Sequence, residues 1–103
     1  MEKKNLDWGN LSFAYMPTDY RFVAHYKDGA WDEGILTTDS MCTMSECAGV
    51  IQYAQTCFEG LKAYTTKDGR IVAFRPDLNA ERLMNSADRL MIPQVSKEMF
   101  LRA

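Results

Sequence analysis

Three arginines offer the chemistry that the sequence suggests most directly. Arg75, Arg82 and Arg89 lie seven residues apart, close to two helical turns, so Arg82 and Arg89 would project from much the same side of a helix. A guanidinium presents a planar fork of N–H donors that matches the oxygens of a phosphate. Arg82 is therefore a candidate phosphate ligand. The alternative is an ordinary solvated arginine on a helix surface.

A second candidate site precedes the arginines in the chain. Tyr53 and Phe58 would give aromatic walls to a pocket for an aliphatic side chain, and Gly60 would let a ligand approach the backbone closely. Periodicity alone favours the other interpretation, which is core packing followed by a glycine at the start of a strand. Lys62 is a weaker candidate, because a Schiff-base lysine needs burial or a cationic neighbour to become nucleophilic. Its place on a short hairpin favours a solvated lysine.

Two predicted hairpins would position these residues. Residues 20–26 and 31–38 are rich in aromatic and β-branched side chains and flank a Lys-Asp-Gly turn. Residues 61–65 and 70–74 alternate in the same way around an Asp-Gly turn. Asp-Gly accepts the positive φ that tight hairpin turns require, so the second hairpin is a strong local prediction.

Helices are predicted to follow the hairpins. Pro76 suits the first helical turn, and Pro93 is predicted to end this helix after roughly four turns. A second helix should begin at Ser96 as its N-cap. Because strands come first and helices second, the sequence predicts an α+β fold, with two β-hairpins in a mainly antiparallel sheet and helices packed on it. The apolar stripe of the first helix comprises Ala80, Leu83, Met84, Ala87, Leu90 and Met91.

Composition narrows the classes of partner and the cellular compartment. The chain has 103 residues, 47% of them hydrophobic, which is enough for one domain and would allow a packed core. Twelve basic and 14 acidic residues give a net charge of −2, so no basic surface for nucleic acid is predicted. The chain contains no apolar run typical of a signal peptide or a membrane span. Three cysteines without a Cys-x-x-Cys pair, and one histidine far from them, predict a cytoplasmic protein with no metal site.

Two blocks of sequence, joined by the second predicted hairpin, form a specific pattern. The first is Tyr-x4-Phe-Glu-Gly-Leu-Lys-Ala-Tyr at residues 53–64. The second is Phe-Arg-Pro-x-Leu-Asn-x-x-Arg-Leu-x-x-Ser-Ala-x-Arg-Leu at residues 74–90. Together they resemble the branched-chain amino acid aminotransferases, which are class IV (fold-type IV) enzymes dependent on pyridoxal 5'-phosphate. Phe13, Thr18-Asp19 and the Gly-Ala-Trp turn at 29–31 also fit, so the resemblance covers nearly the whole chain.

The resemblance implies a role for particular residues. The arginine of the Asn-x-x-Arg-Leu motif binds the phosphate of the cofactor in this family, so Arg82 would take that role. Tyr53, Phe58 and Phe13 would line the pocket for the branched side chain, and Gly60 would lie near the substrate. The implied reaction is amino transfer between leucine, isoleucine or valine and 2-oxoglutarate, in a homodimer with no membrane or nucleic-acid partner.

The family's remaining catalytic groups are expected elsewhere. Its cofactor lysine, a second phosphate-binding segment and the glutamate beside the pyridine nitrogen lie in a large C-terminal domain that is absent from this chain. The helix that begins at Ser96 also has no stop signal before Ala103. We therefore predict that residues 1–103 form an incomplete small N-terminal domain, which carries no catalytic residue and is inactive alone.

Other functions fit parts of the pattern. The nearest alternative is another class IV enzyme, either a D-amino acid aminotransferase or an aminodeoxychorismate lyase. These enzymes share the arginine before Leu83 but look less like the Phe58-to-Ala63 block. An alternative from a different class is a non-catalytic module that binds a phosphate ligand or a partner.

Overall fold

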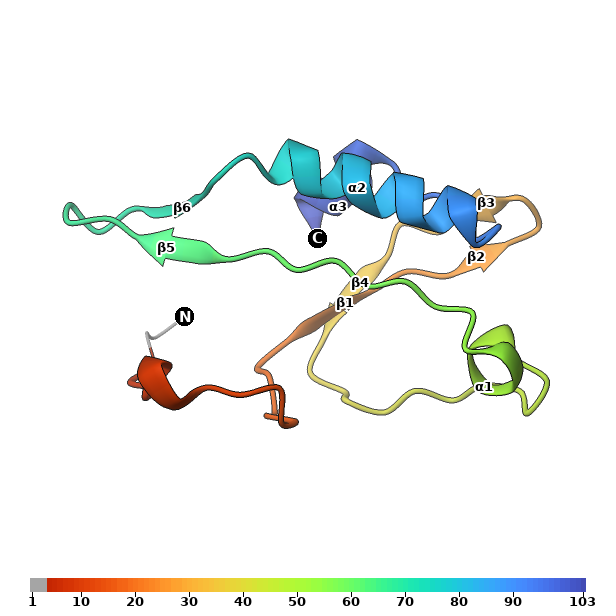
Figure 1. Cartoon of the computed structure of the whole chain (residues 1–103), viewed down its shortest axis with the longest axis horizontal. Helices are drawn as coiled ribbons and strands as arrows, with labels where there is room; N and C mark the ends of the chain where they lie inside the picture. Colours follow the sequence, from red (N-terminus) through yellow and green to blue (C-terminus); the bar gives the residue numbers. More distant parts are fainter. Residues whose placement is uncertain (1–3) are drawn as a thin grey trace.

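The computed structural model describes residues 4–103, so the first three residues of the predicted domain 1–103 lie outside it. The α+β class is confirmed, because short antiparallel strands precede two of the three α-helices (Figure 1). In chain order the elements are the 3-10 helix η1 (Trp8–Asn10), β1 (Arg21–Val23), β2 (Tyr26–Lys27), β3 (Ala30–Trp31), β4 (Ile35–Thr37), α1 (Gly49–Tyr53), β5 (Ala63–Thr65), β6 (Ile71–Ala73), α2 (Pro76–Arg89) and α3 (Lys97–Arg102).

The first predicted hairpin is confirmed and consists of two successive strand pairs. Strand β1 pairs with β4, and further along the hairpin β2 pairs with β3. The turn residues Asp28 and Gly29 have φ of 52° and 86°, as the Asp-Gly signal predicted. Between the two pairs, Asp32 accepts hydrogen bonds from the backbone N–H of His25 (3.0 Å) and Gly34 (2.9 Å). These bonds hold the hairpin together where its strand pairing is interrupted.

The second predicted hairpin is also confirmed. Strands β5 and β6 pair in antiparallel register with Tyr64 opposite Val72. Its turn closes with Gly69 at φ of 86° and a hydrogen bond from the Thr66 N–H to the Arg70 carbonyl (2.8 Å). All six strand residues are exposed on both faces, and the hairpin extends away from the rest of the chain (Figure 1).

Helix α2 begins at Pro76, where the missing N–H of proline leaves no donor unsatisfied. Its predicted apolar stripe is correct for the first three turns. Ala80 and Ala87 are buried, and Leu83 and Met84 between them are half-buried. Helix α2 packs against α3.

The end of α2 differs from the prediction. The helix stops at Arg89, before Pro93 is reached, because Met91 adopts a left-handed conformation with φ of 55°. The N–H of Ile92 then donates back to the carbonyl of Ala87 (2.9 Å), which satisfies a free carbonyl of the last turn. The last two apolar residues of the predicted stripe lie beyond the helix and are exposed.

Helix α3 begins where the sequence predicted. The Ser96 hydroxyl accepts a hydrogen bond from the Met99 N–H (3.1 Å) and so caps the helix. At its other end the Arg102 guanidinium donates to the Glu33 carbonyl and lies 5.8 Å from the centre of the Phe22 ring. Helix α3 therefore connects α2 to the first hairpin.

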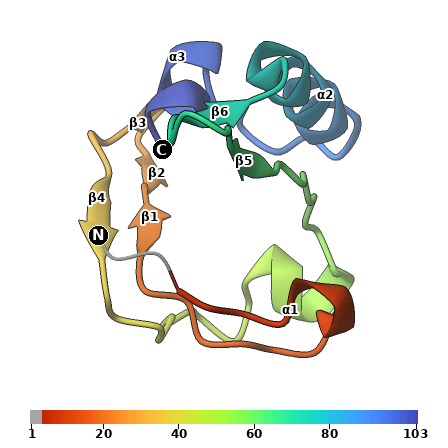
Figure 2. The same cartoon turned by 90° about the vertical axis from the view of Figure 1, so that its left-hand side faces the viewer.

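The elements form an open frame and do not pack around one core (Figure 2). The strands are antiparallel, as predicted, but they form three separate two-stranded sheets and not one shared sheet. Only Ala80 and Ala87 are buried among the hydrophobic residues of 4–103. The Cα radius of gyration is 15.8 Å, against about 13 Å for a compact domain of this length. The apolar composition would allow a packed core, but the described residues do not form one, because the second hairpin leaves both of its faces uncovered.

No helix within residues 4–103 is long and apolar enough to cross a membrane.

Candidate functional site

The two sequence blocks meet in an ion pair between Arg82 and Glu59. Arg82 lies in the second turn of α2, and Glu59 lies in the extended segment that leads to β5. The Arg82 Nε donates to Glu59 Oε2 at 2.6 Å, and Nη2 donates to Oε1. Two parallel N–H···O bonds of this kind fix the relative orientation of the two groups.

Asn79 strengthens the same junction. It precedes Arg82 by three residues, so both side chains lie on one face of α2. The Asn79 Nδ2 donates to Glu59 Oε1 (3.0 Å) and to the Gly60 carbonyl (2.8 Å). The Glu59 carboxylate also accepts the Gly60 N–H (2.9 Å). The start of α2 is thereby fixed to the base of the second hairpin. We call Glu59, Gly60, Asn79 and Arg82 the arginine clamp.

The two charged members of the arginine clamp differ sharply in exposure. The Glu59 side chain is 5% exposed, whereas the Arg82 side chain is 68% exposed. Hydrogen bonds from Arg82 and then Asn79 lower the pKa of Glu59 from 4.5 to about 2. Glu59 in turn raises the pKa of Arg82. The clamp is thus a covered carboxylate beneath a guanidinium that faces solvent.

The depressed pKa of Glu59 predicts how the arginine clamp responds to acid. Because the pKa is lower in the folded state than in the unfolded chain, the stabilisation is complete above about pH 4.5 and is lost as the pH falls toward 2. We expect the ¹³C signal of the Glu59 carboxyl to titrate near 2, and Arg82→Ala to move that midpoint up. A midpoint at the ordinary glutamate value in the unmodified protein would contradict the clamp geometry.

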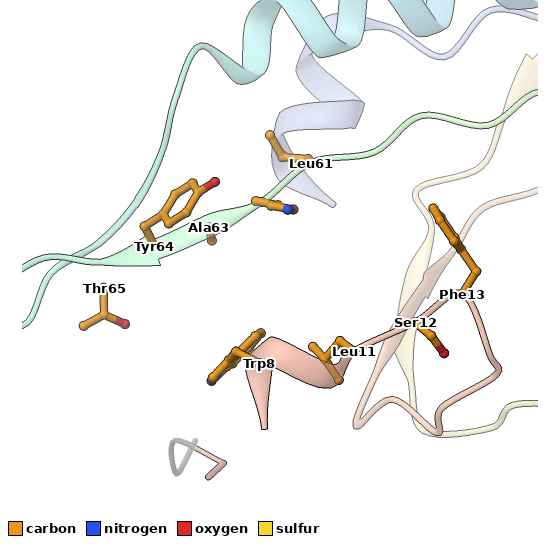
Figure 3. A pocket seen from close by; sticks show the side chains of 9 residues that line it. Trp8, Leu11, Ser12, Phe13, Leu61, Ala63, Tyr64 and Thr65 are labelled. Atoms are coloured by element: carbon orange, nitrogen blue, oxygen red, sulfur yellow. The ribbon is translucent and has the colours of Figure 1, made fainter. Parts of the chain in front are cut away.

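A pocket lies beside the arginine clamp, along the same extended segment. Its volume is about 940 Å³, and it separates the N-terminal segment around η1 from the segment that enters β5 (Figure 3). One wall carries Trp8, Leu11 and Phe13, and the other carries Leu61 and Tyr64 among its larger side chains. The pocket is lined by Trp8, Leu11, Ser12, Phe13, Leu61, Lys62, Ala63, Tyr64 and Thr65.

Comparison with known proteins finds similarity to aminotransferases. Over 100 residues the chain is 59% identical to a branched-chain-amino-acid aminotransferase of Haemophilus influenzae. The matched region covers 97% of this chain and 29% of that protein. The chain is 50% identical to the Helicobacter pylori enzyme of the same name, with the same coverage of each chain. Over almost its whole length the chain is similar to the branched-chain aminotransferases. No protein-family profile matches it.

One further relative has a different substrate in its name. The chain is 44% identical to a methionine aminotransferase of Arabidopsis thaliana over 96% of its length. The chain spans less than a third of the length of each of these three relatives.

The structure brings together some of the residues that the family resemblance indicated and separates others. Arg82 and Gly60 meet in the arginine clamp, and Phe13 lines the pocket. Phe58 precedes the clamp but its side chain is 85% exposed, and Tyr53 at the end of α1 is 87% exposed. Neither lines the pocket within residues 4–103. At Gly60 an added Cβ would meet only the Phe58 ring, at 3.6 Å, which is an ordinary contact.

Sequence reasoning missed the role of Glu59 and Asn79. Both belong to the recognised motifs, but their types alone did not show that a carboxylate and a helix residue 20 positions later would meet. Lys62 is exposed at the edge of the pocket. No group of three His, Cys, Asp or Glu side chains in the described part of the chain could hold a metal ion.

Proposed function

We propose that this chain forms the small N-terminal domain of a branched-chain aminotransferase, within a longer protein whose second domain supplies the cofactor lysine. The observation that carries the proposal is the arginine clamp, which presents one exposed guanidinium from a fixed position at the start of a helix. The family relatives support it, since the chain matches a segment of each one. The same proposal places the whole protein in the cytoplasm.

The cofactor of this proposal is pyridoxal 5'-phosphate. Its phosphate is a dianion that suits an exposed guanidinium. Glu59 accepts hydrogen bonds from only some of the N–H donors of Arg82, so others are left for the phosphate. When bound, the cofactor acts as the electron sink for amino transfer. Arg82 would hold the phosphate end of the cofactor.

Leucine, isoleucine and valine are the proposed amino donors, with 2-oxoglutarate as acceptor. Phe13 lines the pocket, and in our proposal Tyr53 and Phe58 complete its apolar wall once the rest of the protein is in place. Methionine is a further candidate, because one relative is named for it and its side chain is similarly apolar. Gly60 would lie beside the substrate at the base of the hairpin.

A homodimer is part of the proposal. Large apolar side chains are exposed over much of the chain, including Phe13, Tyr53, Phe58 and Phe74. Apolar surface on this scale indicates contact with further protein. A large domain and a second subunit would cover it.

The test is leucine-dependent conversion of 2-oxoglutarate to glutamate with added pyridoxal phosphate. It is run on residues 1–103 and on the protein expressed from the whole reading frame. We expect activity in the longer protein and none in the 103-residue chain, because no lysine within residues 4–103 is buried and so suited to bind the cofactor. Activity in the short chain would contradict the predicted inactivity and would make Lys62 the candidate Schiff-base lysine.

A non-catalytic phosphate-binding module is the second candidate function. It is favoured by one observation, which is that the arginine clamp is complete within this chain. Inactivity of both proteins toward leucine and methionine, together with retained phosphate binding, would support the module. Activity toward D-alanine and not leucine would indicate another class IV enzyme.

A further inference from the structure

Glu59 is held by more contacts than a surface ion pair needs. Its Oε1 accepts from Asn79 Nδ2 (3.0 Å), from the Gly60 N–H (2.9 Å) and from Arg82 Nη2, and its Oε2 accepts from Arg82 Nε (2.6 Å). The side chain is 5% exposed, in a chain that covers few side chains. A carboxylate with this many donors has one orientation and cannot follow a mobile arginine.

The contacts with Glu59 occupy one edge of the Arg82 guanidinium and leave a second edge free to bind an anion. An arginine has five N–H donors, and Glu59 takes one from Nε and one from Nη2. Within residues 4–103, Nη1 donates to no side chain or carbonyl. The Nη1–Nη2 edge therefore keeps two parallel N–H groups, which is the arrangement that binds a phosphate through two oxygens.

We propose that Glu59 is a positioning residue for Arg82, holding the guanidinium so that its Nη1–Nη2 edge is preset for a phosphate monoester. The inference rests on the proposed function, because the phosphate is that of the proposed cofactor. A free arginine loses rotamer freedom when it binds an anion, and a guanidinium already held by a carboxylate loses less. The fixed edge also sets the direction from which the phosphate arrives.

The opposing effect is charge. Glu59 is negative and lies one guanidinium away from the site of a phosphate dianion, so its Coulomb repulsion weakens binding. A substitution that removes the charge of Glu59 but keeps the size of its side chain therefore decides between positioning and repulsion. If positioning dominates, Glu59→Gln weakens phosphate binding. If repulsion dominates, Glu59→Gln tightens it.

The chain offers a matched control in Asp77 and Arg75. Asp77 also accepts hydrogen bonds from the Nε (2.9 and 3.2 Å) and the Nη2 (2.7 Å) of an arginine, Arg75, at the start of the same helix. This pair makes no contact with Arg82 or Glu59. Asp77→Asn is thus the same chemical change at a position that we do not assign to the phosphate.

The experiment measures the dissociation constants of pyridoxal phosphate and of pyridoxal by absorbance titration, in the protein expressed from the whole reading frame. We expect Glu59→Gln to weaken pyridoxal phosphate binding about tenfold and to leave pyridoxal binding unchanged. Asp77→Asn should change neither. If Glu59→Gln does not fold, Asn79→Ala replaces it, with an expected loss of about threefold.

The double variant Glu59→Gln/Arg82→Ala separates positioning from a general structural effect. If Glu59 acts through Arg82, the double variant binds pyridoxal phosphate no more weakly than Arg82→Ala alone. Additive losses, equal losses for pyridoxal, or tighter binding of Glu59→Gln would overturn the positioning role. If Arg82→Ala itself has no effect, the proposed function fails first, so the two failures are distinguishable.

Discussion

Replacing Arg82 with alanine is expected to weaken the binding of pyridoxal phosphate to the complete protein by about 100-fold. A hydrogen bond to a charged group contributes roughly 1.5–3 kcal/mol, and the proposed contact is a fork of two such bonds. About 3 kcal/mol corresponds to roughly two factors of ten in the dissociation constant. The measurement is an absorbance titration with pyridoxal phosphate, repeated with phosphate-free pyridoxal, whose affinity should not change.

Arg89→Ala is the matched control for this prediction. Arg89 lies two helical turns further along α2, is exposed, and belongs to neither the arginine clamp nor the pocket. Its removal should leave both affinities unchanged. If Arg82→Ala behaves like Arg89→Ala, Arg82 is the solvated helix arginine that composition alone favours, and the proposed cofactor site is wrong.

Gly34→Ala should destabilise the fold by about 2–4 kcal/mol, for two physical reasons that add. Gly34 has φ of 68°, which is a left-handed conformation that a Cβ disfavours. A Cβ at this position would also lie 2.2 Å from Phe22 Cζ and 2.6 Å from Cε1, well inside contact distance. The ring would have to move, and it would then lose its contact with the Arg102 guanidinium.

Gly29→Ala separates the steric clash from the backbone strain. Gly29 lies at the turn of the same hairpin with φ of 86°, and a Cβ there meets nothing within 4 Å. Its substitution should cost only the backbone term of about 1–2 kcal/mol. Urea unfolding of both variants gives the comparison. Equal costs would show that Phe22 yields freely and that the clash contributes nothing.

The parts of the fold that local chemistry determines could be predicted from the sequence. Asp28-Gly29 and Gly69 placed both hairpin turns, Pro76 placed the start of α2, and Ser96 capped α3. Each of these depends on a few neighbouring residues whose side chains favour one backbone conformation. Their correct prediction therefore required no knowledge of the rest of the molecule.

The end of α2 and the arrangement of the sheets could not be predicted in this way. Met91 has no intrinsic preference for the left-handed conformation that ends the helix. The sequence therefore predicts the helix end at Pro93 instead. Similarly, alternation within each hairpin indicates a strand but does not state whether two hairpins share a sheet. A composition rich in apolar residues predicted a core, although these side chains have no covering layer within residues 4–103.

The sequence predicts some residues of the candidate site but not the contacts that join them. Arg82 and Gly60 were indicated by residue type and by resemblance, and both lie in the arginine clamp. Glu59 lies in the first motif, but the sequence assigns it no role, since its pairing with Arg82 spans 23 residues of chain. A contact at that sequence separation depends on the tertiary fold.

The hairpin between the two motifs gives the chain freedom to change in length. Within residues 4–103 its strands β5 and β6 pair only with each other, and Thr66 to Arg70 close it at a tip far from the arginine clamp (Figure 1). Doubling the length of a flexible loop costs only about 0.6 kcal/mol, so added residues at the tip leave the base undisturbed. Evolution or a protein engineer can thus insert an epitope, a label or a longer turn at Lys67 without moving Glu59 relative to Arg82.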